Sequence, residues 1–435
     1  MFQELPVMKK FLKYILLCTL LFLPELSAET LLDAKGRPVR YAGNFDNSKI
    51  VLQNYLPRVD EFRGIWVAVV ENIDFLPHKT AYSFQRDFCK MLNNIKAAGF
   101  TAVIFQIRSN CDAFYPTNLA PWSRWLTGTE GKHLGKDFDP LKFMITETHR
   151  RKMEFHAWFN PYRVIGNTKM SKKAYLATLA PGNFARRNPQ FVLCKRNPAG
   201  NQLFLDPGIP QVVDHLAAVV ADVVRRYPVD AVHFDDYFYP YEKLGNEDAL
   251  TYNAYNPRRL SLANWRRSNT DSLIFRIRQT ISRINMTQKR KVRFGVSPFG
   301  IWANKKNHPL GSLTGGKETL NDLFANTRAW VKYGYVDYIA PQIYWPFSHN
   351  VAAYAALVDW WCRCIQGTKV KLYIGMAAYN GKVWQSNELI NQMRYNRMQH
   401  NVSGAAFFSY RSFFGKESNP GASGLLRYIR SSGRR

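Results

Sequence analysis

Residues 229–241 read Val229-Asp230-Ala231-Val232-His233-Phe234-Asp235-Asp236-Tyr237-Phe238-Tyr239-Pro240-Tyr241, a short apolar run followed by two carboxylates and a cluster of aromatic side chains. Carboxylates at the end of a strand can serve as acid, base or nucleophile, and the aromatic faces that follow can stack on sugar rings. A helix cap followed by a hydrophobic loop would have the same composition. The meaning of this stretch therefore depends on the rest of the chain.

The same format of an apolar strand, a loop and an amphipathic helix occurs eight times. Strands buried on both faces of a parallel sheet read as short apolar runs, and such runs lie at 63–69, 101–107, 154–159, 231–235, 292–296, 338–344, 371–377 and 404–409. Helical patterns lie between them, at 84–98, 140–152, 210–226, 261–284, 320–332, 351–365, 387–400 and 422–430. No G-x-G-x-x-G follows the first strand, which argues against an open dinucleotide-binding sheet. We predict an α/β fold, a closed (β/α)8 TIM barrel with its chemistry at the C-terminal ends of the strands.

One large domain is expected, because 46% hydrophobic residues over 435 positions can bury a sizeable core. We assign 63–435 to the catalytic barrel and 29–62 to an N-terminal extension that wraps around it. Long loops are predicted on the C-terminal face, at 161–209, 237–260 and 297–319. A monomer is the expected oligomeric state.

The N-terminal residues 1–28 have the pattern of a secretory signal peptide, with lysines ahead of the apolar run 14–23 and small residues after it. The apolar run is too short to span a membrane comfortably. Bulky Leu17 directly before Cys18 argues against a lipid anchor. We therefore expect export to the periplasm or cell envelope.

The formal net charge is +28, from 60 Lys and Arg against 32 Asp and Glu, and this excess implies an acidic partner. The chain has no recognisable nucleic-acid-binding motif, so an exported protein would instead meet anionic cell-wall glycan. No H-x-x-x-H or H-E-x-x-H occurs, and we expect neither a metal nor another cofactor.

An ordered series of sequence blocks resembles the glycosyl-hydrolase-like family ten of bacterial TIM barrels. The blocks are Arg63–Ala68, Phe105–Arg108, Asp112–Pro116, His156–Arg163, Asp206–Pro210, Phe234–Tyr237, Phe294–Pro298, Tyr338–Pro346 and Tyr373–Gly375. The resemblance implies a glycosidase that cleaves peptidoglycan strands stripped of their stem peptides, in contact with the cell-division machinery. Such strands expose the lactyl carboxylate of every N-acetylmuramic acid, which suits a basic protein.

Two carboxyl groups must flank the scissile glycosidic bond, one to protonate the leaving oxygen and one to act as nucleophile or base. Asp235 is the first candidate. It lies two residues after His233 on the same strand, so both side chains should point to the same side, and Asp235 should face the barrel interior if His233 does. Asp236 is the second. Neighbours at a strand end point in different directions, so we expect the partner from another strand, either Asp74, Asp112 or Glu71. The resemblance favours Asp74 and Asp112.

Side chains after several strands are candidates for substrate binding. Arg108 and Arg163 can pair with a carboxylate or a muramic lactyl group. Asn160 and Tyr162 can hydrogen-bond sugar hydroxyls or an acetamido group. The other candidates comprise strand and loop polar groups and stacking platforms, namely His156, His233, Tyr237, Gln342, Trp302, Tyr344 and Trp345.

Three alternatives to this function share parts of its sequence pattern. The chitinase pattern D-x-x-D-x-D-x-E departs here at His233 and Tyr237, and the missing terminal Glu argues against a chitinase-like, substrate-assisted mechanism. A metal-dependent polysaccharide deacetylase would also use adjacent aspartates, but the histidine motifs are lacking. A non-catalytic wall-glycan-binding protein could use the same basic, aromatic cleft.

Overall fold

A computed structural model describes residues 28–416 and 418–432. The predicted signal peptide, except for Ala28, lies outside the described residues. Within the described part, no helix is long and apolar enough to cross a membrane. The cysteines there are free, at positions 89, 111, 194, 362 and 364.

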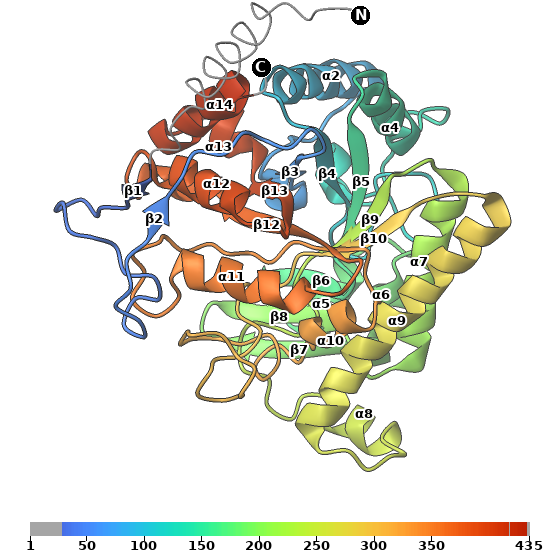
Figure 1. Cartoon of the computed structure of the whole chain (residues 1–435). Helices are drawn as coiled ribbons and strands as arrows, with labels where there is room; N and C mark the ends of the chain where they lie inside the picture. Colours follow the sequence, from blue (N-terminus) through green and yellow to red (C-terminus); the bar gives the residue numbers. More distant parts are fainter. Residues whose placement is uncertain (1–27, 417, 433–435) are drawn as a thin grey trace, which may run out of the picture.

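Eight parallel strands close into a barrel (Figure 1), which confirms the predicted fold. They are β3 (Phe62–Val67), β4 (Ala102–Arg108), β5 (Glu154–Phe159), β9 (Ala231–Phe234), β10 (Arg293–Val296), β11 (Tyr338–Ile339), β12 (Lys371–Ala377) and β13 (Val402–Phe408). The barrel closes between β13 and β3, where Gly404 pairs with Phe62. Its strands are almost wholly buried, since helices cover them outside and side chains fill the interior.

Helices surround the barrel. The main ones are α2 (Ala81–Ala97), α4 (Pro140–Arg150), α7 (Pro210–Arg226), α9 (Leu262–Gln288), α10 (Thr327–Lys332), α11 (Tyr354–Ile365), α12 (Glu388–Met398) and α14 (Pro420–Ser432). The shorter ones are α3 (Arg124–Thr127), α5 (Lys172–Thr178), α6 (Phe184–Arg187), α8 (Ala249–Ala254), α13 (Tyr410–Phe414), and the 3-10 turns η1 (Val70–Asn72), η2 (Pro189–Phe191) and η3 (Ala378–Lys382).

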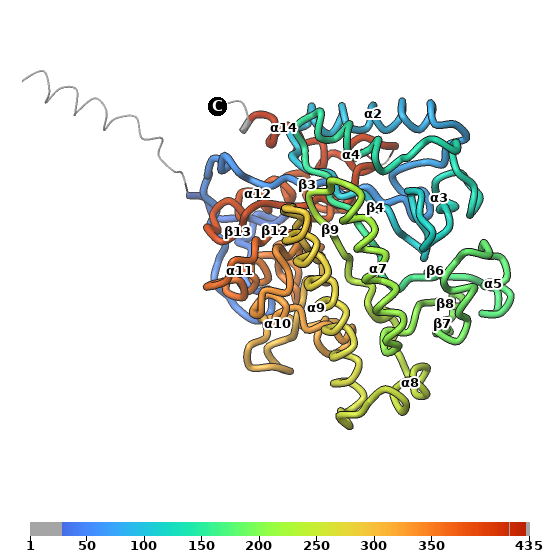
Figure 2. The backbone as a smooth tube through the Cα atoms, turned by 90° about the vertical axis from the view of Figure 1, so that its right-hand side faces the viewer, coloured from blue at the N-terminus to red at the C-terminus, as the bar shows by residue number. Residues whose placement is uncertain are grey.

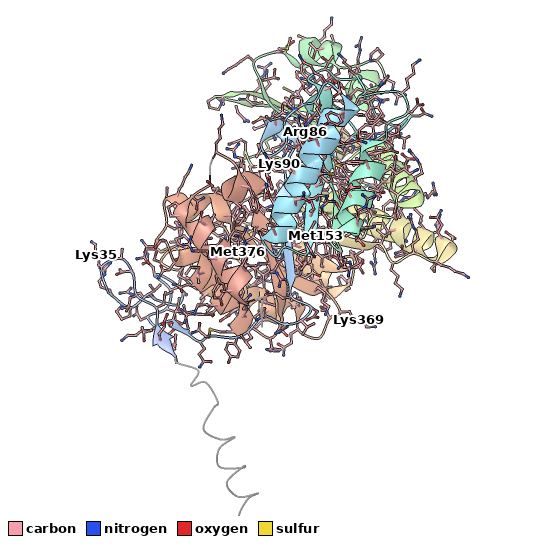
Figure 3. All side chains as sticks on the ribbon, turned by 90° about the horizontal axis from the view of Figure 1, so that it is seen from above. Lys35, Arg86, Lys90, Met153, Lys369 and Met376 are labelled. Atoms are coloured by element: carbon pink, nitrogen blue, oxygen red, sulfur yellow. The ribbon has the colours of Figure 1, made fainter. Side chains whose placement is uncertain are left out.

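Helix α2 illustrates how the sequence forms these elements. The Thr80 hydroxyl accepts a hydrogen bond from the Ser83 amide and caps the helix. Phe84 and Phe88 are four residues apart and so face the core together. Arg86 and Lys90 stand on the outer side (Figure 3), where basic residues are spread over distant parts of the surface.

Two elements are shorter than predicted. Strand β11 ends at Ile339, because Pro341 has no amide proton to continue the ladder. Gln342 still forms isolated bridges to the neighbouring strands, so the predicted direction of the chain is kept. Helix α10 begins only at Thr327, because the backbone before it forms a turn instead, in which the Glu318 amide donates to the Asp322 carboxylate and the Glu318 carbonyl accepts the Asp322 and Leu323 amides.

The long loops hold structure of their own. The loop after β5 contains an antiparallel sheet of β6 (Arg163–Thr168), β8 (Gly200–Leu205) and β7 (Val192–Asn197), which the sequence analysis did not predict. The loop after β9 contains α8, held to α9 by a buried ion pair between Asp248 and Arg266. Figure 2 shows α8 and this sheet together at the lower right, on one side of the barrel.

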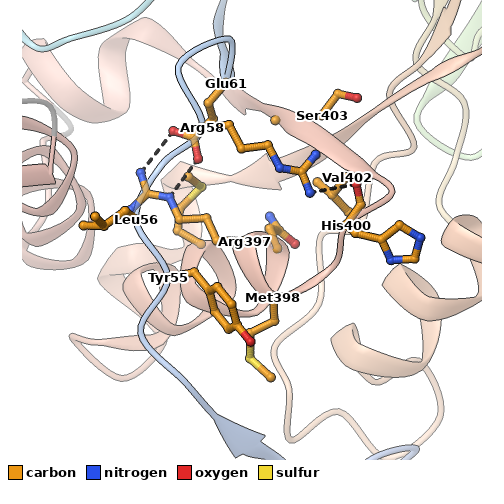
Figure 4. A pocket seen from close by; sticks show the side chains of 12 residues that line it. Tyr55, Leu56, Arg58, Glu61, Arg397, Met398, His400, Val402 and Ser403 are labelled. Atoms are coloured by element: carbon orange, nitrogen blue, oxygen red, sulfur yellow. Dashed lines mark hydrogen bonds and ion pairs between the residues drawn. The ribbon is translucent and has the colours of Figure 1, made fainter. Parts of the chain in front are cut away.

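The segment before the first barrel strand contains a small antiparallel pair, β1 (Glu29–Thr30) with β2 (Val51–Leu52). It lies against α11 and α12 (Figure 1), where Tyr41 donates a hydrogen bond to Asp359 at 2.8 Å. At the end of this segment, Glu61 forms a buried ion pair with Arg397 of α12. Figure 4 shows the pair beside a hollow of about 220 Å³ at the N-terminal ends of the strands.

Candidate active site

A pocket of about 330 Å³ opens at the C-terminal ends of the barrel strands. Its volume lies within the usual range for small-ligand sites. Its walls come from the ends of all eight barrel strands and the loops after them, namely Trp66, Ala68, Val70, Ile73, Gln106, Trp158, Arg163, Asp235, Asp236, Tyr237, Ser297, Gln342, Tyr344, Tyr379 and Phe408. Aromatic faces and a few polar groups therefore surround the tandem aspartates.

Asp235 follows the last residue of β9 and lines the pocket. Its Oδ2 accepts hydrogen bonds from Asn160 Nδ2 at 2.8 Å and Trp158 Nε1 at 3.2 Å. Its Oδ1 is buried without a hydrogen-bond partner among the described residues. Burial raises the pKa of this carboxyl to about 6, although the positive charge of Arg163 works in the opposite direction.

Asp236 also lines the pocket and accepts a hydrogen bond from the hydroxyl of Tyr241. Burial, and then the neighbouring charge of Asp235, raise the pKa of Asp236 to about 8. The two residues are 3% and 4% exposed, so water screens neither charge well. The pair therefore titrates as a unit that holds one proton and one negative charge near neutral pH, and Asp236 is its more basic member.

A hydrogen-bonded layer supports the pocket floor from inside the barrel. Trp66 Nε1 can only donate, so His233 Nε2, at 3.2 Å, accepts its proton. His233 Nδ1 then donates to the Tyr338 hydroxyl at 3.0 Å, and that hydroxyl donates to His156 at 2.9 Å. Burial lowers the pKa of both histidines, which are neutral. The layer holds Trp66 in place beneath the pocket.

One wall of the pocket depends on Gln106 and the turn after β3. Gln106 Oε1 accepts the amide protons of Val69 and Val70 at 3.1 and 3.0 Å. Its Nε2 is buried and has no partner in the described chain, although the residue lines the pocket. In this turn Glu71 takes a left-handed conformation, with φ of 54°, which is strained for a residue with a side chain.

Cations and aromatic rings alternate along the rim. The guanidinium of Arg163 lies 4.3 Å from the centroid of the Tyr237 ring. The Tyr237 and Tyr241 rings are 5.4 Å apart, and Lys317 Nζ lies 5.4 Å from the Tyr241 centroid. Lys317 also donates to the backbone carbonyl of Tyr241. Arg163 and Tyr237 thus place a cation and an aromatic ring in the pocket lining, and Tyr241 and Lys317 extend this row beyond it.

Several predicted site residues come together here. The pocket is lined by Asp235, Asp236, Arg163, Tyr237, Gln342 and Tyr344. Asn160 lies behind Asp235, and His233 lies beneath the floor. Trp345 is set back from the pocket, with its ring 5.3 Å from that of Phe299.

Asp74 and Asp112, two carboxylates expected from other strands, lie outside the pocket and hold backbone amides and hydroxyls. Asp74 accepts bonds from the Ala68 and Arg411 amides and the Ser409 hydroxyl, each at 2.8 Å, and so ties the end of β3 to the end of β13. Asp112 accepts the Ser109 and Asn110 amides and the Ser123 hydroxyl, and so closes a buried turn. Neither lines the pocket.

Four predicted substrate-binding residues also lie outside the pocket. Arg108 donates to the carbonyls of Asn160 and Pro161, which fixes the loop after β5. Trp302 stacks on Trp360 and donates to Asn326. The other two are buried away from the pocket, namely His156, which pairs with Glu154 and Tyr338, and Tyr162.

The sequence analysis missed the pocket residues Trp66, Gln106, Trp158, Ser297, Tyr379 and Phe408. A signal was available for three of them. Trp66, Gln106 and Trp158 sit near the C-terminal ends of predicted strands, where inward-facing side chains meet the active face of a barrel. They occur within apolar runs, where their inward position is not marked by charge. Within residues 28–416 and 418–432, no group of three His, Cys, Asp or Glu side chains gathers so that it could hold a metal ion.

Comparison with known proteins bears on this site. The model of the family described as Glycosyl hydrolase-like 10 matches residues 61–392. Glycosyl hydrolase YngK of Bacillus subtilis is 42% identical over 365 residues, which cover 81% of this chain and 68% of that protein. Glycosyl hydrolase DigH of Escherichia coli K12 is 40% identical over 372 residues, which cover 80% and 82% of the two chains. Among solved structures, the endo-1,4-beta-mannanase of Rhizomucor miehei is 10% identical, with a TM-score of 0.49 and coverage of 88% and 99%.

Proposed function

This chain belongs to the glycosyl hydrolase-like 10 family and is a glycoside hydrolase, and from that premise we propose that it cleaves peptide-free peptidoglycan strands in the cell envelope. The observation that carries the proposal is the pair Asp235–Asp236 in an aromatic-walled pocket. One member is protonated and the other is charged near neutral pH. A protonated carboxyl can supply the acid that glycosidic bond cleavage requires, and the charged one can stabilise positive charge that develops on the sugar.

The rim chemistry supports an anionic glycan as substrate. Arg163 lines the pocket, and Lys317 lies above the next ring along the rim, so both can meet a carboxylate held beside a stacked sugar. A peptide-free strand offers such a lactyl carboxylate on every second sugar. The net charge of +28 favours the approach of a polyanion.

The proposed location rests on the N-terminal sequence. Lysines followed by an apolar run and small residues within 1–28 are typical of an exported protein. Peptidoglycan lies outside the cytoplasm, so an enzyme that acts on it must be exported. We also propose contact with the cell-division machinery, which binding measurements with its proteins test.

Digestion of peptide-free strands tests the proposed substrate. We expect purified wild type to shorten strands prepared with an amidase, because Asp235 and Asp236 act on a bond between stacked sugars. Asp235→Asn should leave the strands intact, since the amide cannot supply the negative charge. Product masses, read by mass spectrometry, identify the bond that breaks. Chitin oligosaccharides of equal length lack the lactyl carboxylate and should be cleaved more slowly.

The same experiment separates the alternatives. If neither protein cuts any strand but both bind them, the wall-glycan-binding alternative replaces the proposed function. If chitin oligosaccharides are cut as fast as peptide-free strands, the rim cations do not select the lactyl group and the proposed substrate is wrong.

The pH dependence of kcat/KM should be bell-shaped. Asp235 must be ionised, so activity should rise as pH increases through about 6. Asp236 must be protonated, so activity should fall above about 8. Below the first pKa and above the second, kcat/KM should fall about tenfold per pH unit. Initial rates between pH 4 and 10 provide the measurement.

A matched control variant tests which carboxyl group causes the acidic side of the pH profile. Burial also raises the pKa of Asp271 to about 6, but this carboxyl accepts a hydrogen bond from Trp330 outside the pocket. Asp271→Asn should therefore keep both limbs. A profile that loses its acidic limb in this variant would show that the limb reports another part of the protein.

A further inference from the structure

We propose that the nucleophile in this site belongs to the substrate, and that the enzyme acts through the 2-acetamido group of the sugar whose bond it breaks. The inference rests on the proposed function in that it concerns the same pocket. It goes further because it names the chemical group without which cleavage fails. In this scheme Asp236 is the acid, and Asp235 holds and polarises the acetamide.

The first step of the argument concerns which carboxylates of the protein are placed to act as nucleophile. Of the described residues that line the pocket, two carry carboxylates, and these are neighbours in the chain. A protein nucleophile or base must stand about 5 to 9.5 Å from the acid, on the other side of the sugar ring. Asp74 and Asp112 are committed to backbone amides and hydroxyls elsewhere. The exposed Glu71, in the turn that forms one wall, remains as a rival nucleophile.

The unpartnered atoms of the pocket fit an acetamide. Asp235 is fixed by Asn160 and Trp158 through Oδ2, which leaves Oδ1 as a buried acceptor without a bond in the described chain. An acetamide N–H is the donor that this oxygen lacks. Gln106 Nε2 is a buried donor of a second residue that lines the same pocket, and it can bond a sugar oxygen. Buried polar groups normally have partners, so these two atoms point to a ligand.

The proton positions also suit this chemistry. Asp236 keeps its proton near neutral pH, because burial and the Asp235 charge raise its pKa to about 8. Asp235 is ionised there and can stabilise the positive charge that develops on the acetamide nitrogen. The indole rings of Trp66 and Trp158 border the same space and offer an apolar surface to the acetyl methyl group.

The reaction balances without a co-reactant other than water. The acetamide oxygen forms a bond to the anomeric carbon, and the bond from that carbon to the glycosidic oxygen breaks. The glycosidic oxygen keeps the electron pair and takes the proton of Asp236. The resulting oxazolinium ion is paired with Asp235. Water then attacks the anomeric carbon and gives a proton to Asp236, which reopens the ring and regenerates the acetamide with net retention.

This assignment changes one sequence-based expectation. The chitinase pattern has its acid, a glutamate, at position 237, and its absence here predicts that no such mechanism operates. In the structure Tyr237, at that position, stacks against Arg163, and Asp236 is the protonated group in the pocket. A substrate-assisted reaction therefore does not need a glutamate at residue 237.

Substrates with an altered amide test the inference. Peptide-free strands are de-N-acetylated and then either re-acetylated or trifluoroacetylated. Trifluoroacetylation keeps a neutral amide but weakens its oxygen as a nucleophile. We expect re-acetylated strands to be cut normally, and the trifluoroacetylated strands at least about 10²-fold more slowly, because an intramolecular nucleophile contributes a large part of the rate. Equal rates on both would overturn the proposal.

A second measurement does not depend on turnover. The thiazoline of N-acetylglucosamine mimics the oxazolinium ion, and calorimetry should show that it binds to wild type and at least about tenfold more weakly to Asp235→Asn. Glu71→Gln should retain both thiazoline binding and cleavage. Loss of cleavage in Glu71→Gln, together with no thiazoline binding to wild type, would show that Glu71 is the nucleophile and overturn the proposal.

The two measurements distinguish failure of the inference from failure of the proposed function. Thiazoline binding with cleavage of chitin oligosaccharides but not of peptide-free strands would refute the wall substrate and support the acetamide mechanism. Cleavage of peptide-free strands that is indifferent to the amide and to the thiazoline would support the wall substrate and overturn the mechanism.

Discussion

Asp236→Asn is expected to lower kcat on peptide-free strands by about 10³-fold, the usual size of a lost general acid. The leaving group is a sugar alkoxide, which cannot depart without a proton at neutral pH. Asp236 is the protonated member of the buried pair, and an amide cannot replace it. The measurement compares this natural leaving group with a nitrophenyl 2-acetamido sugar. The nitrophenolate needs no proton, so the variant should lose less than about tenfold on it.

An equal loss on both leaving groups would contradict the role of Asp236 as acid. Thermal unfolding is the control that shows whether Asp236→Asn is folded. The Asp236 pKa is raised from 3.8 to about 8, so the folded state holds a proton that the unfolded state releases between these pH values. Wild-type stability should therefore fall as pH rises from about 4 to 8, whereas Asp236→Asn lacks this penalty. The variant should thus unfold at no lower temperature than wild type at pH 8.

Glu61→Leu is expected to lower the free energy of unfolding by about 3 to 5 kcal/mol, the usual cost of breaking a buried ion pair by removing one partner. Glu61 accepts bonds from Arg397 at 2.7 and 3.0 Å and from Arg63 at 3.0 Å. The side chains of Glu61 and Arg397 are 5% and 4% exposed, so water cannot replace the lost partner. Denaturant unfolding followed by fluorescence measures the change.

Two comparisons sharpen this result. Asp214 forms an exposed ion pair with Arg276, and Asp214→Ala should change stability little, because exposed pairs are screened. Glu61 lies at the N-terminal end of the barrel, beside the hollow in Figure 4, so folded Glu61→Leu should keep the wild-type kcat. A large loss of kcat without loss of stability would mean that the opposite end of the barrel influences the pocket.

Local sequence was enough to predict the barrel and one side of its site. Short apolar runs separated by amphipathic helices allow few folds, and the run before Asp235 ends one residue earlier than predicted, at Phe234. Parity along this strand predicted that Asp235 would share the inward side with His233, and Asp235 does line the pocket. The hairpin of β7 and β8 also had a local signal, because Asn197-Pro198-Ala199-Gly200 is a turn sequence, but the analysis treated it as loop.

The tertiary structure alone decided which residues share the pocket and which carboxylates are available. Asp74 and Asp112 follow strands just as Asp235 does, yet amides and hydroxyls brought from β13 and from a distant turn occupy them. Burial raises the pKa of both Asp235 and Asp236, the charge of Asp235 raises that of Asp236 further, and no sequence window contains that information. Sequence determined the strands because their pattern is local, whereas the site depends on desolvation and hydrogen bonds between distant segments.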